Sequence, residues 1–271
     1  RGRHSLSRAN TYVNKKYTPV KNGIKMGLYE GYTPVFLQFS KEPEYVHVPD
    51  WYYNIEYFRE QERGNEYQED LFVPGYFELP IKKGESIVFM ASLDEVNPTS
   101  LKNMFYREKN KRIPRDSFEH CLENSAQQFI IQEDNKTEVI AGYPRFGAWG
   151  RDTFVSLPGL TLSLNRPNAF KKVIDTMIHS MKGPLFPNVG GVIKDEYDSA
   201  DAPFWFIWSL QQYASYTGDA AGVWHNYKNT IKKILNGFNQ GTEFNIHVQE
   251  NGLLWTGENG KAVTWMDAYV D

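Results

Sequence analysis

The hydrophobic period of the sequence changes near residue 116, and this change limits the folds open to the chain. From about residue 5 to 95, short apolar runs alternate with turn-forming Gly, Pro and Asn, which is typical of β-strands. After Asp116, apolar residues recur at the helical spacing of 3.6. We therefore predict an α+β multidomain chain, with a β-sandwich-like domain followed by a region of paired helices.

Six segments of the first region are predicted as strands. They are HSLSRANTYV (4–13), PVFLQFS (34–40), EYVHV (44–48), YYNIEYF (52–58), DLFVPGYFELPI (70–81) and ESIVFMASL (85–93). Residues 82–85 read as a hairpin-like turn, and Pro80 places its strand at a sheet edge because proline cannot donate to the ladder.

Residues 97–115 separate the two regions. Proline near their start and a basic run from Arg107 to Arg115 indicate a solvated linker helix. The predicted domains are thus 1–96, a β-sandwich-like domain that is N-terminally incomplete, then the linker helix 97–115, and then 116–271.

Five helices are predicted in the last region. The first follows a Ser117 cap and carries the stripe Phe118, Cys121, Leu122, Ala126, Phe129 and Ile130. The others are expected from 151 or 152 to 164 with a bend at Pro158, from Pro167 onward, over 202–216 and over 220–238. A hairpin with an Asn251-Gly252 turn follows. Long loops precede the second and fourth helices, and these loops should gather at one end, where function usually resides.

Composition excludes several classes of function. A formal net charge of −3 gives no basic footprint for nucleic acid. The single cysteine, Cys121, excludes an internal disulfide framework and fits a reducing compartment. No run of 18 apolar residues and no signal peptide is visible, so we expect a cytoplasmic protein without a membrane partner, although the start at Arg1 suggests a processed or partial chain. Nucleotide, metal and serine-hydrolase motifs are absent from the sequence, so no cofactor or metal is expected.

The stretch AGYPRFGAWGRDTFVSLPGL (141–160) reads as a binding site. Its glycines allow close approach of a ligand, and its aromatics supply flat apolar faces. Arg151 and Asp152 add a donor fork beside an acceptor pair. Such a set suits a sugar, which has many hydroxyls and apolar C–H faces. The alternative, given equal weight, is that Asp152 merely caps a helix and Arg151 is solvated.

Carboxylates on aromatic-rich loops are the remaining candidates for catalysis. Glycoside hydrolysis needs one protonated and one ionised carboxyl group. Asp267 suits the acid, because neighbouring aromatics such as Trp265 would raise its pKa by desolvation. Asp152 suits an acceptor that holds sugar hydroxyls, because Arg151 and a helix N-terminus favour its ionised form. For Asp201, a helix N-cap is at least as well supported as sugar contact. The group Asp195, Glu196 and Asp198 is interpreted as a solvated loop.

Three segments resemble successive blocks of one enzyme family. WGRDTFVSLPGL, GGVIKDEYDSADAPFWFIWSL and NGLLWTGENGKAVTWMDAYVD are similar, in order and spacing, to the amylo-α-1,6-glucosidase domain of glycogen debranching enzymes. HSLSRAN and EDLFVPGYF resemble the β domain that precedes it in bacterial members. The resemblance covers essentially the whole chain.

The resemblance implies a β-sandwich-like domain, a catalytic (α/α)6 barrel, and hydrolysis of α-1,6-linked glucose stubs of glycogen or limit dextrin with inversion and without a cofactor. By the resemblance, Arg151 and Asp152 would hold the terminal glucose and Asp267 would be the general acid. Trp149, Trp265 and Asp201 would line the same pocket.

The chain departs from the family pattern in two respects. Only five of twelve barrel helices are readable, and the family's general base lies in the C-terminal part of the barrel. We therefore expect that these 271 residues do not contain the general base and that they need the remainder of the barrel to complete the site. Ala148 stands where a polar residue is expected. The alternatives are a noncatalytic carbohydrate-binding fragment and a related inverting α-glucosidase, similar to trehalase or glucoamylase.

Overall fold

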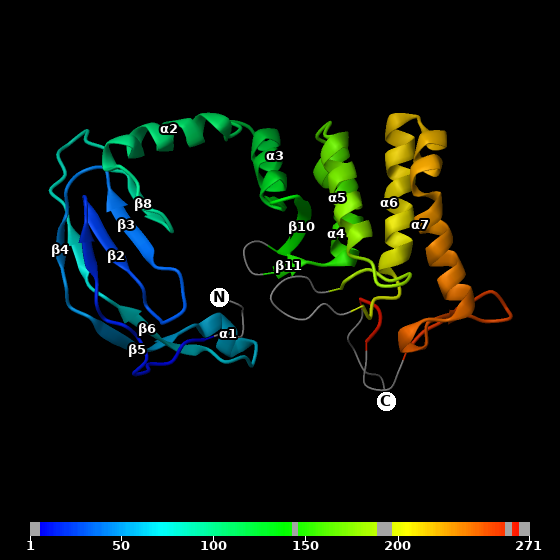
Figure 1. The fold of residues 1–271 in the computed structure, drawn as a ribbon, viewed down its shortest axis with the longest axis horizontal. Coiled ribbons are helices and arrows are strands. Elements are labelled where there is room, and N and C mark those ends of the chain that lie inside the picture. The colour runs from blue at the N-terminus through cyan, green and yellow to red at the C-terminus, as the bar shows by residue number, and fades with distance from the viewer. Residues whose placement is uncertain (1–5, 143–145, 189–196, 258–261, 266–271) are drawn as a thin grey trace. The chain divides into compact units, whose positions relative to one another are not determined.

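The computed structural model describes residues 6–142, 146–188, 197–257 and 262–265 of the chain. It divides into two compact units, Arg1–Ile113 and Pro114–Asp271 (Figure 1). The division falls inside the segment 97–115 that the sequence indicates as a linker. Within the described ranges the chain mixes several small sheets with seven α-helices.

From residue 6 onward, where the structure describes it, the first unit contains three small antiparallel sheets. The largest has four strands in the order β1-β2-β3-β8, with bounds Thr18–Val20, Gly23–Met26, Val35–Phe39 and Phe89–Ser92. The two-stranded sheets pair β4 (Glu44–Val46) with β7 (Tyr76–Glu78), and β5 (Asp50–Glu56) with β6 (Gln68–Val73). Five of the six predicted segments therefore contain strands.

Two strand predictions need correction. The segment predicted at 70–81 is divided between β6 and β7, because Gly75 has a φ of 153° and breaks the extended run after Pro74. Within the predicted segment 4–13, described residues form no strand. The β1–β2 hairpin was not predicted, and its turn depends on Asn22 in the left-handed region at a φ of 55°.

Buried carboxylates on β6 hold the segment before β1 in place. The Asp70 carboxylate accepts hydrogen bonds of 2.9 Å from the backbone N–H groups of Ala9 and Asn54. These two bonds lower the pKa of Asp70, because they favour the ionised carboxylate. The neighbouring Glu69 accepts from the backbone N–H of Ser7 at 3.3 Å. The motifs HSLSRAN and EDLFVPGYF, 61 residues apart at the Ala9–Asp70 bond, thus contact each other.

Helices complete the first unit. A short α1 spans Phe58–Glu62, and a 3-10 turn, Pro98–Ser100, leads into α2, Leu101–Lys111. Asn97 caps this start by accepting a hydrogen bond of 3.2 Å from the Thr99 N–H. The helix predicted within 97–115 is therefore present.

The second unit is mainly helical. Its helices are α3 (Phe118–Gln128), α4 (Gly150–Leu157), α5 (Pro167–His179), α6 (Ala202–Thr217) and α7 (Ala220–Gln240). Strands β9 (Ile130–Glu133), β10 (Lys136–Gly142) and β11 (Phe146–Ala148) form a sheet in the order β11-β10-β9. A 3-10 turn, Glu243–Asn245, precedes the hairpin of β12 (His247–Val248) and β13 (Leu254–Trp255).

Helix α3 and the sheet after it differ from the prediction. The Ser117 cap is confirmed, since its side chain accepts from the His120 N–H at 3.1 Å. The helix nevertheless ends at Gln128, and Ile130 begins β9. Only the C-terminal end of the predicted apolar stripe packs against the core, through Phe129 and Ile130. At its start Phe118 is 72% exposed. The sheet was missed because the predicted helix was extended through Ile130, the first residue of β9, and because the turn to β10 depends on Asp134 at a φ of 50°.

The predictions for α4 to α7 and for the final hairpin are confirmed, with small shifts at their ends. Pro158 begins a π-helical turn, Pro158–Leu162, where the sequence predicts a bend. Figure 1 shows α6 between α5 and α7, and α4 packs against α6. Three buried rings join α4 to α6, since Phe154 lies 4.7 Å from Phe186 and 5.4 Å from Phe206 between centroids. Within the described part of the chain, no helix has the length and apolar character that a membrane crossing requires.

Candidate functional site

The start of α4 is fixed by a close backbone contact. The N–H of Gly150 donates to the carbonyl of Pro187 at 2.9 Å. A Cβ atom at position 150 would lie 2.7 Å from the same oxygen, so a larger residue would displace the 186–188 segment. The glycine predicted to let a ligand approach thus serves close packing within the protein. Trp149 is the N-cap residue of α4, and its side chain makes no capping bond.

Arg151 pairs with Asp201 at the start of α6. Its Nε donates to Oδ2 at 2.7 Å and its Nη2 donates to Oδ1 at 2.9 Å. Ser199 is fully buried, accepts from the same Nη2 at 3.2 Å and donates to Asp201 Oδ1 at 2.7 Å. The two charged side chains are 16% and 24% exposed, so this three-residue network is largely shielded from water.

Asp201 is held ionised by its partners. Burial raises the pKa of the Asp201 carboxyl, but hydrogen bonds from Arg151 and Ser199 and the guanidinium charge together hold that pKa below its usual value. Asp201 occupies the N-cap position of α6, which is one of the two interpretations of this residue from the sequence. Its side chain, however, makes no capping hydrogen bond. Its carboxylate is directed to Arg151 instead.

Asp152 lies one residue beyond Arg151 and has a different environment. It is in the first turn of α4 rather than at the cap, so the cap interpretation of this residue is wrong. Among the described residues, its exposed carboxylate has no hydrogen-bond or ion-pair partner. Asp152 and Arg151 both border a cavity of about 330 Å³, whose other lining residues are Phe129, Ile140, Ala141, Val155, Ser156 and Leu160. The carboxylate is therefore free to accept from a ligand.

The segment around Val263 contacts the loop before α6, which carries Ser199 and Asp201. The N–H of Ala200, between Ser199 and Asp201, donates to the carbonyl of Val263 at 2.8 Å, and Val263 is buried. Two residues further on, Trp265 is 67% exposed. Asp267, the predicted general acid, lies outside the described residues, as do Asp195 and Glu196.

Two features of the loop were not predicted from the sequence. Ser199 gave no signal, because a serine before an aspartate is common in any loop. Asp198 was interpreted as solvated, but it is only partly exposed and accepts from Asn188 Nδ2 at 3.0 Å. This correction follows from the proximity of the 186–188 segment, which sequence spacing does not show. Among the described residues, no group of three or more His, Cys, Asp or Glu side chains is placed to hold a metal ion.

Comparison with known proteins assigns the chain to a family. The family model described as amylo-alpha-1,6-glucosidase matches residues 124–271, and the one described as glycogen debranching enzyme N terminal matches residues 1–88. The second unit, which carries the candidate site, therefore matches the amylo-alpha-1,6-glucosidase family model over most of its length. The chain belongs to the glycogen debranching enzyme family.

A curated relative agrees with this assignment. The chain is 30% identical over 100 residues to a protein of Saccharomyces cerevisiae named glycogen debranching enzyme. The match covers 35% of this chain and 6% of the yeast protein, so the chain spans a small part of that relative's length.

Proposed function

We propose that this chain is part of a glycoside hydrolase that removes α-1,6-linked glucose stubs from glycogen or limit dextrin with inversion at the anomeric carbon. Membership of the family supports the substrate class. We also propose that residues 1–96 form a β-sandwich-like domain, that 97–115 link it to the next domain, and that 116–271 form the first part of an (α/α)6 barrel. We propose in addition that the protein is located in the cytoplasm.

The observation that carries the proposal is the junction of three segments at the Arg151–Asp201 pair. Ala200 lies in this junction and is bonded to Val263, four residues before Asp267. The described part of the chain thus brings Val263, four positions before the proposed acid in the sequence, to the loop that carries Asp201.

Each site residue has a proposed role. Asp201 and Ser199 occupy Nε and Nη2 of Arg151, while Nη1 has no partner among the described residues. A guanidinium fixed in this way can donate from Nη1 to a hydroxyl of the terminal glucose. The Asp152 carboxylate accepts from another hydroxyl. The aromatic faces of Trp149 and Trp265 line the pocket against the sugar's C–H surface.

Asp267 is the proposed general acid. In this role it protonates the glycosidic oxygen as the bond breaks, and a second carboxylate removes a proton from the attacking water. Attack from the opposite face of the sugar ring inverts the anomeric centre. We propose that this base belongs to the C-terminal part of the barrel, as the resemblance to the family implies.

Product analysis tests the function and separates it from its alternatives. The natural full-length protein is incubated with phosphorylase limit dextrin, with trehalose and with maltose, and the first product is followed by proton NMR. We expect β-glucose from the limit dextrin and little release from the two disaccharides. Preferred cleavage of either disaccharide supports the trehalase-like or glucoamylase-like alternative. Binding of dextrin without glucose release supports a noncatalytic carbohydrate-binding role.

A further inference from the structure

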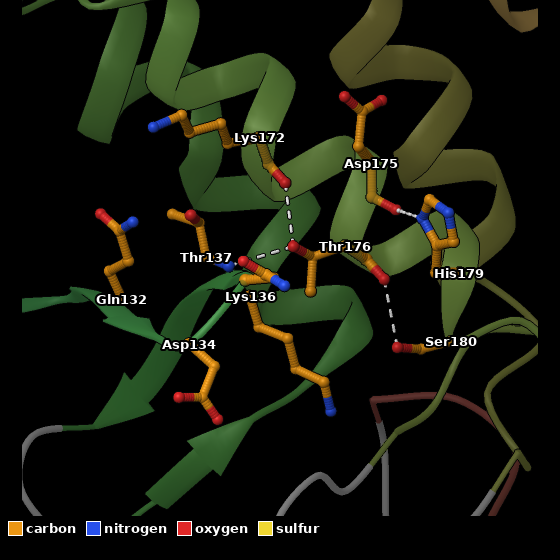
Figure 2. Close-up of a pocket in the computed structure, with 10 residues that line it drawn as sticks. Gln132, Asp134, Lys136, Thr137, Lys172, Asp175, Thr176, His179 and Ser180 are labelled. Carbon is orange, nitrogen blue, oxygen red and sulfur yellow. Dashed lines mark hydrogen bonds between the residues drawn. The ribbon is translucent and has the colours of Figure 1, made fainter.

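A second cavity lies in the same unit, away from the residues of the candidate site. It has a volume of about 630 Å³, within the range of about 300 to 1,000 Å³ for small-ligand sites. It is formed between the turn that joins β9 to β10 and one face of α5 (Figure 2). Its lining residues are Gln132, Asp134, Asn135, Lys136, Thr137, Lys172, Asp175, Thr176, His179 and Ser180.

The floor of this cleft is built from buried threonines. The backbone N–H of Thr137 donates to Thr176 Oγ1 at 3.1 Å, and this hydroxyl donates to the carbonyl of Lys172 at 3.0 Å. Both threonines are less than 9% exposed. Figure 2 shows Thr176 at the centre, where the strand meets the helix. The hairpin is thus fastened to α5, and the positions of the surrounding side chains are fixed by both elements.

The rim consists of polar side chains, most of which have no side-chain partner among the described residues. Within the part of the chain that the structure describes, Gln132, Asp134, Lys136 and Lys172 make no side-chain hydrogen bond or ion pair, and each is exposed. His179 Nδ1 donates to the Asp175 carbonyl at 2.6 Å, which leaves Nε2 available to a ligand. Donors and acceptors therefore surround the same space.

The charges of the cleft indicate the class of ligand. Two lysines are balanced by two aspartates, Asp134 and Asp175, so the cleft favours neither a phosphate nor a cation. A neutral ligand with many hydroxyls uses both donors and acceptors, and lysine, carboxylate and amide groups supply them. One hydrogen bond connects a lining residue of the cleft to the loop before α6, because the Tyr197 hydroxyl donates to the Ser180 carbonyl at 3.1 Å. Tyr197 lies two residues before Ser199.

We propose that this cleft between α5 and the β9–β10 turn is a second binding site for a neutral, linear stretch of α-glucan. The proposal rests on the function proposed above and adds to it. The cleft holds a linear part of the polymer while the branch stub occupies the site at Arg151 and Asp201. It therefore increases affinity for a large glucan and leaves the hydrolysis of short branched oligosaccharides unchanged.

A matched pair of double variants of the natural full-length protein tests the cleft. Asp134→Asn with Lys172→Met removes one acceptor and one donor from the rim. Glu133→Gln with Lys171→Met makes the same chemical changes on adjacent exposed residues that do not line the cleft. Maltoheptaose, which has no α-1,6 branch, is the probe, and its dissociation constant is measured by calorimetry. Circular dichroism confirms folding of both variants.

We expect the cleft variant to weaken maltoheptaose binding about 10-fold, because each lost hydrogen bond reduces affinity about 2- to 10-fold. The control variant should bind like the native protein. Both should release glucose from a short branched oligosaccharide at the native rate. The proposal that the cleft binds α-glucan is overturned if the two variants have equal dissociation constants for maltoheptaose, or if the native protein does not bind it. Selective loss of binding in a protein that releases no glucose supports the cleft and refutes the proposed hydrolysis.

Discussion

Arg151 and Asp201 are 50 residues apart in the chain and form a two-bond ion pair of 2.7 and 2.9 Å. The pair joins the first turn of α4 to the start of α6. Because both helices begin at this pair, it fixes the relative position of their N-terminal ends. We expect the pair to contribute to folding and to the shape of the candidate site at once.

Arg151→Lys should destabilise the protein even though it preserves the charge. Lysine presents a single ammonium and cannot make the two parallel bonds of the guanidinium fork. Loss of one charge-assisted bond in a mostly shielded pair should lower the free energy of unfolding by about 1–3 kcal/mol. Urea unfolding at pH 7 measures this change. A loss below about 0.5 kcal/mol, the usual value for an exposed pair, would show that the network is not a structural element.

The Asp201 pair should also give the stability a specific pH dependence. Because the pKa of Asp201 is lowered in the folded protein, its contribution is fully present above the unfolded value of about 3.9 and is lost as the pH falls below it. The difference in unfolding free energy between native protein and Asp201→Asn should thus be constant from pH 5 to 7 and shrink toward pH 3. A difference that grows on acidification would contradict the lowered pKa.

His120 should titrate above its ordinary value. Its Nδ1 lies 2.5 Å from Asp116 Oδ1, and this hydrogen bond raises the pKa of His120 while it lowers that of Asp116. NMR titration of the ring protons should give a midpoint above about 6.5, and Asp116→Asn should return it toward that value. The charged histidine stabilises the folded state below the unfolded pKa, and this effect is lost as the pH rises through the folded one. An unchanged midpoint in the variant would show that the pair does not form in solution.

Two glycines in helical segments should respond in opposite ways to alanine. At Gly237 of α7, a Cβ atom would lie 2.6 Å from Pro184 Cγ, whereas at Gly159 nothing lies within 4 Å. Gly237→Ala should therefore destabilise by about 1–3 kcal/mol through overpacking. Gly159→Ala should be neutral or stabilising by up to about 1 kcal/mol, because glycine is a poor helix former. Thermal unfolding compares them, and equal effects would mean that Pro184 does not pack against α7.

The helices of the second unit could be predicted because local signals coincide with burial. In α5, Pro167 occupies the first turn, and Phe170, Val173 and Ile174 are fully buried. The end of α6 is set by Gly218 at a φ of 69°. The sheet of β9 to β11 gave no comparable signal, since β9 follows α3 after one residue and the turn to β10 depends on a left-handed aspartate.

The sequence identified Arg151, Asp152 and Asp201 as candidate site residues but not the contacts among them. The sequence places Arg151 beside Asp152, yet neighbouring residues on a helix do not face each other. The partner of Arg151 is Asp201, and the third member, Ser199, is identified only by its burial. Contacts between residues 50 positions apart depend on how α4 and α6 pack, which periodicity alone does not determine. The roles assigned to Trp149, Asp152, Trp265 and Asp267 remain predictions.

Asp267→Asn in the natural full-length protein tests the central claim most directly. Glucose release from phosphorylase limit dextrin is measured for the native protein, for Asp267→Asn and for the control Asp198→Asn, which changes a carboxylate bonded to Asn188 in the neighbouring loop. We predict that native protein releases β-glucose and that Asp267→Asn is slowed by at least about 100-fold, the usual contribution of a general acid. Asp198→Asn should retain most of the activity. Near-native release by Asp267→Asn would contradict the assignment of the acid, and α-glucose as the first product would contradict inversion.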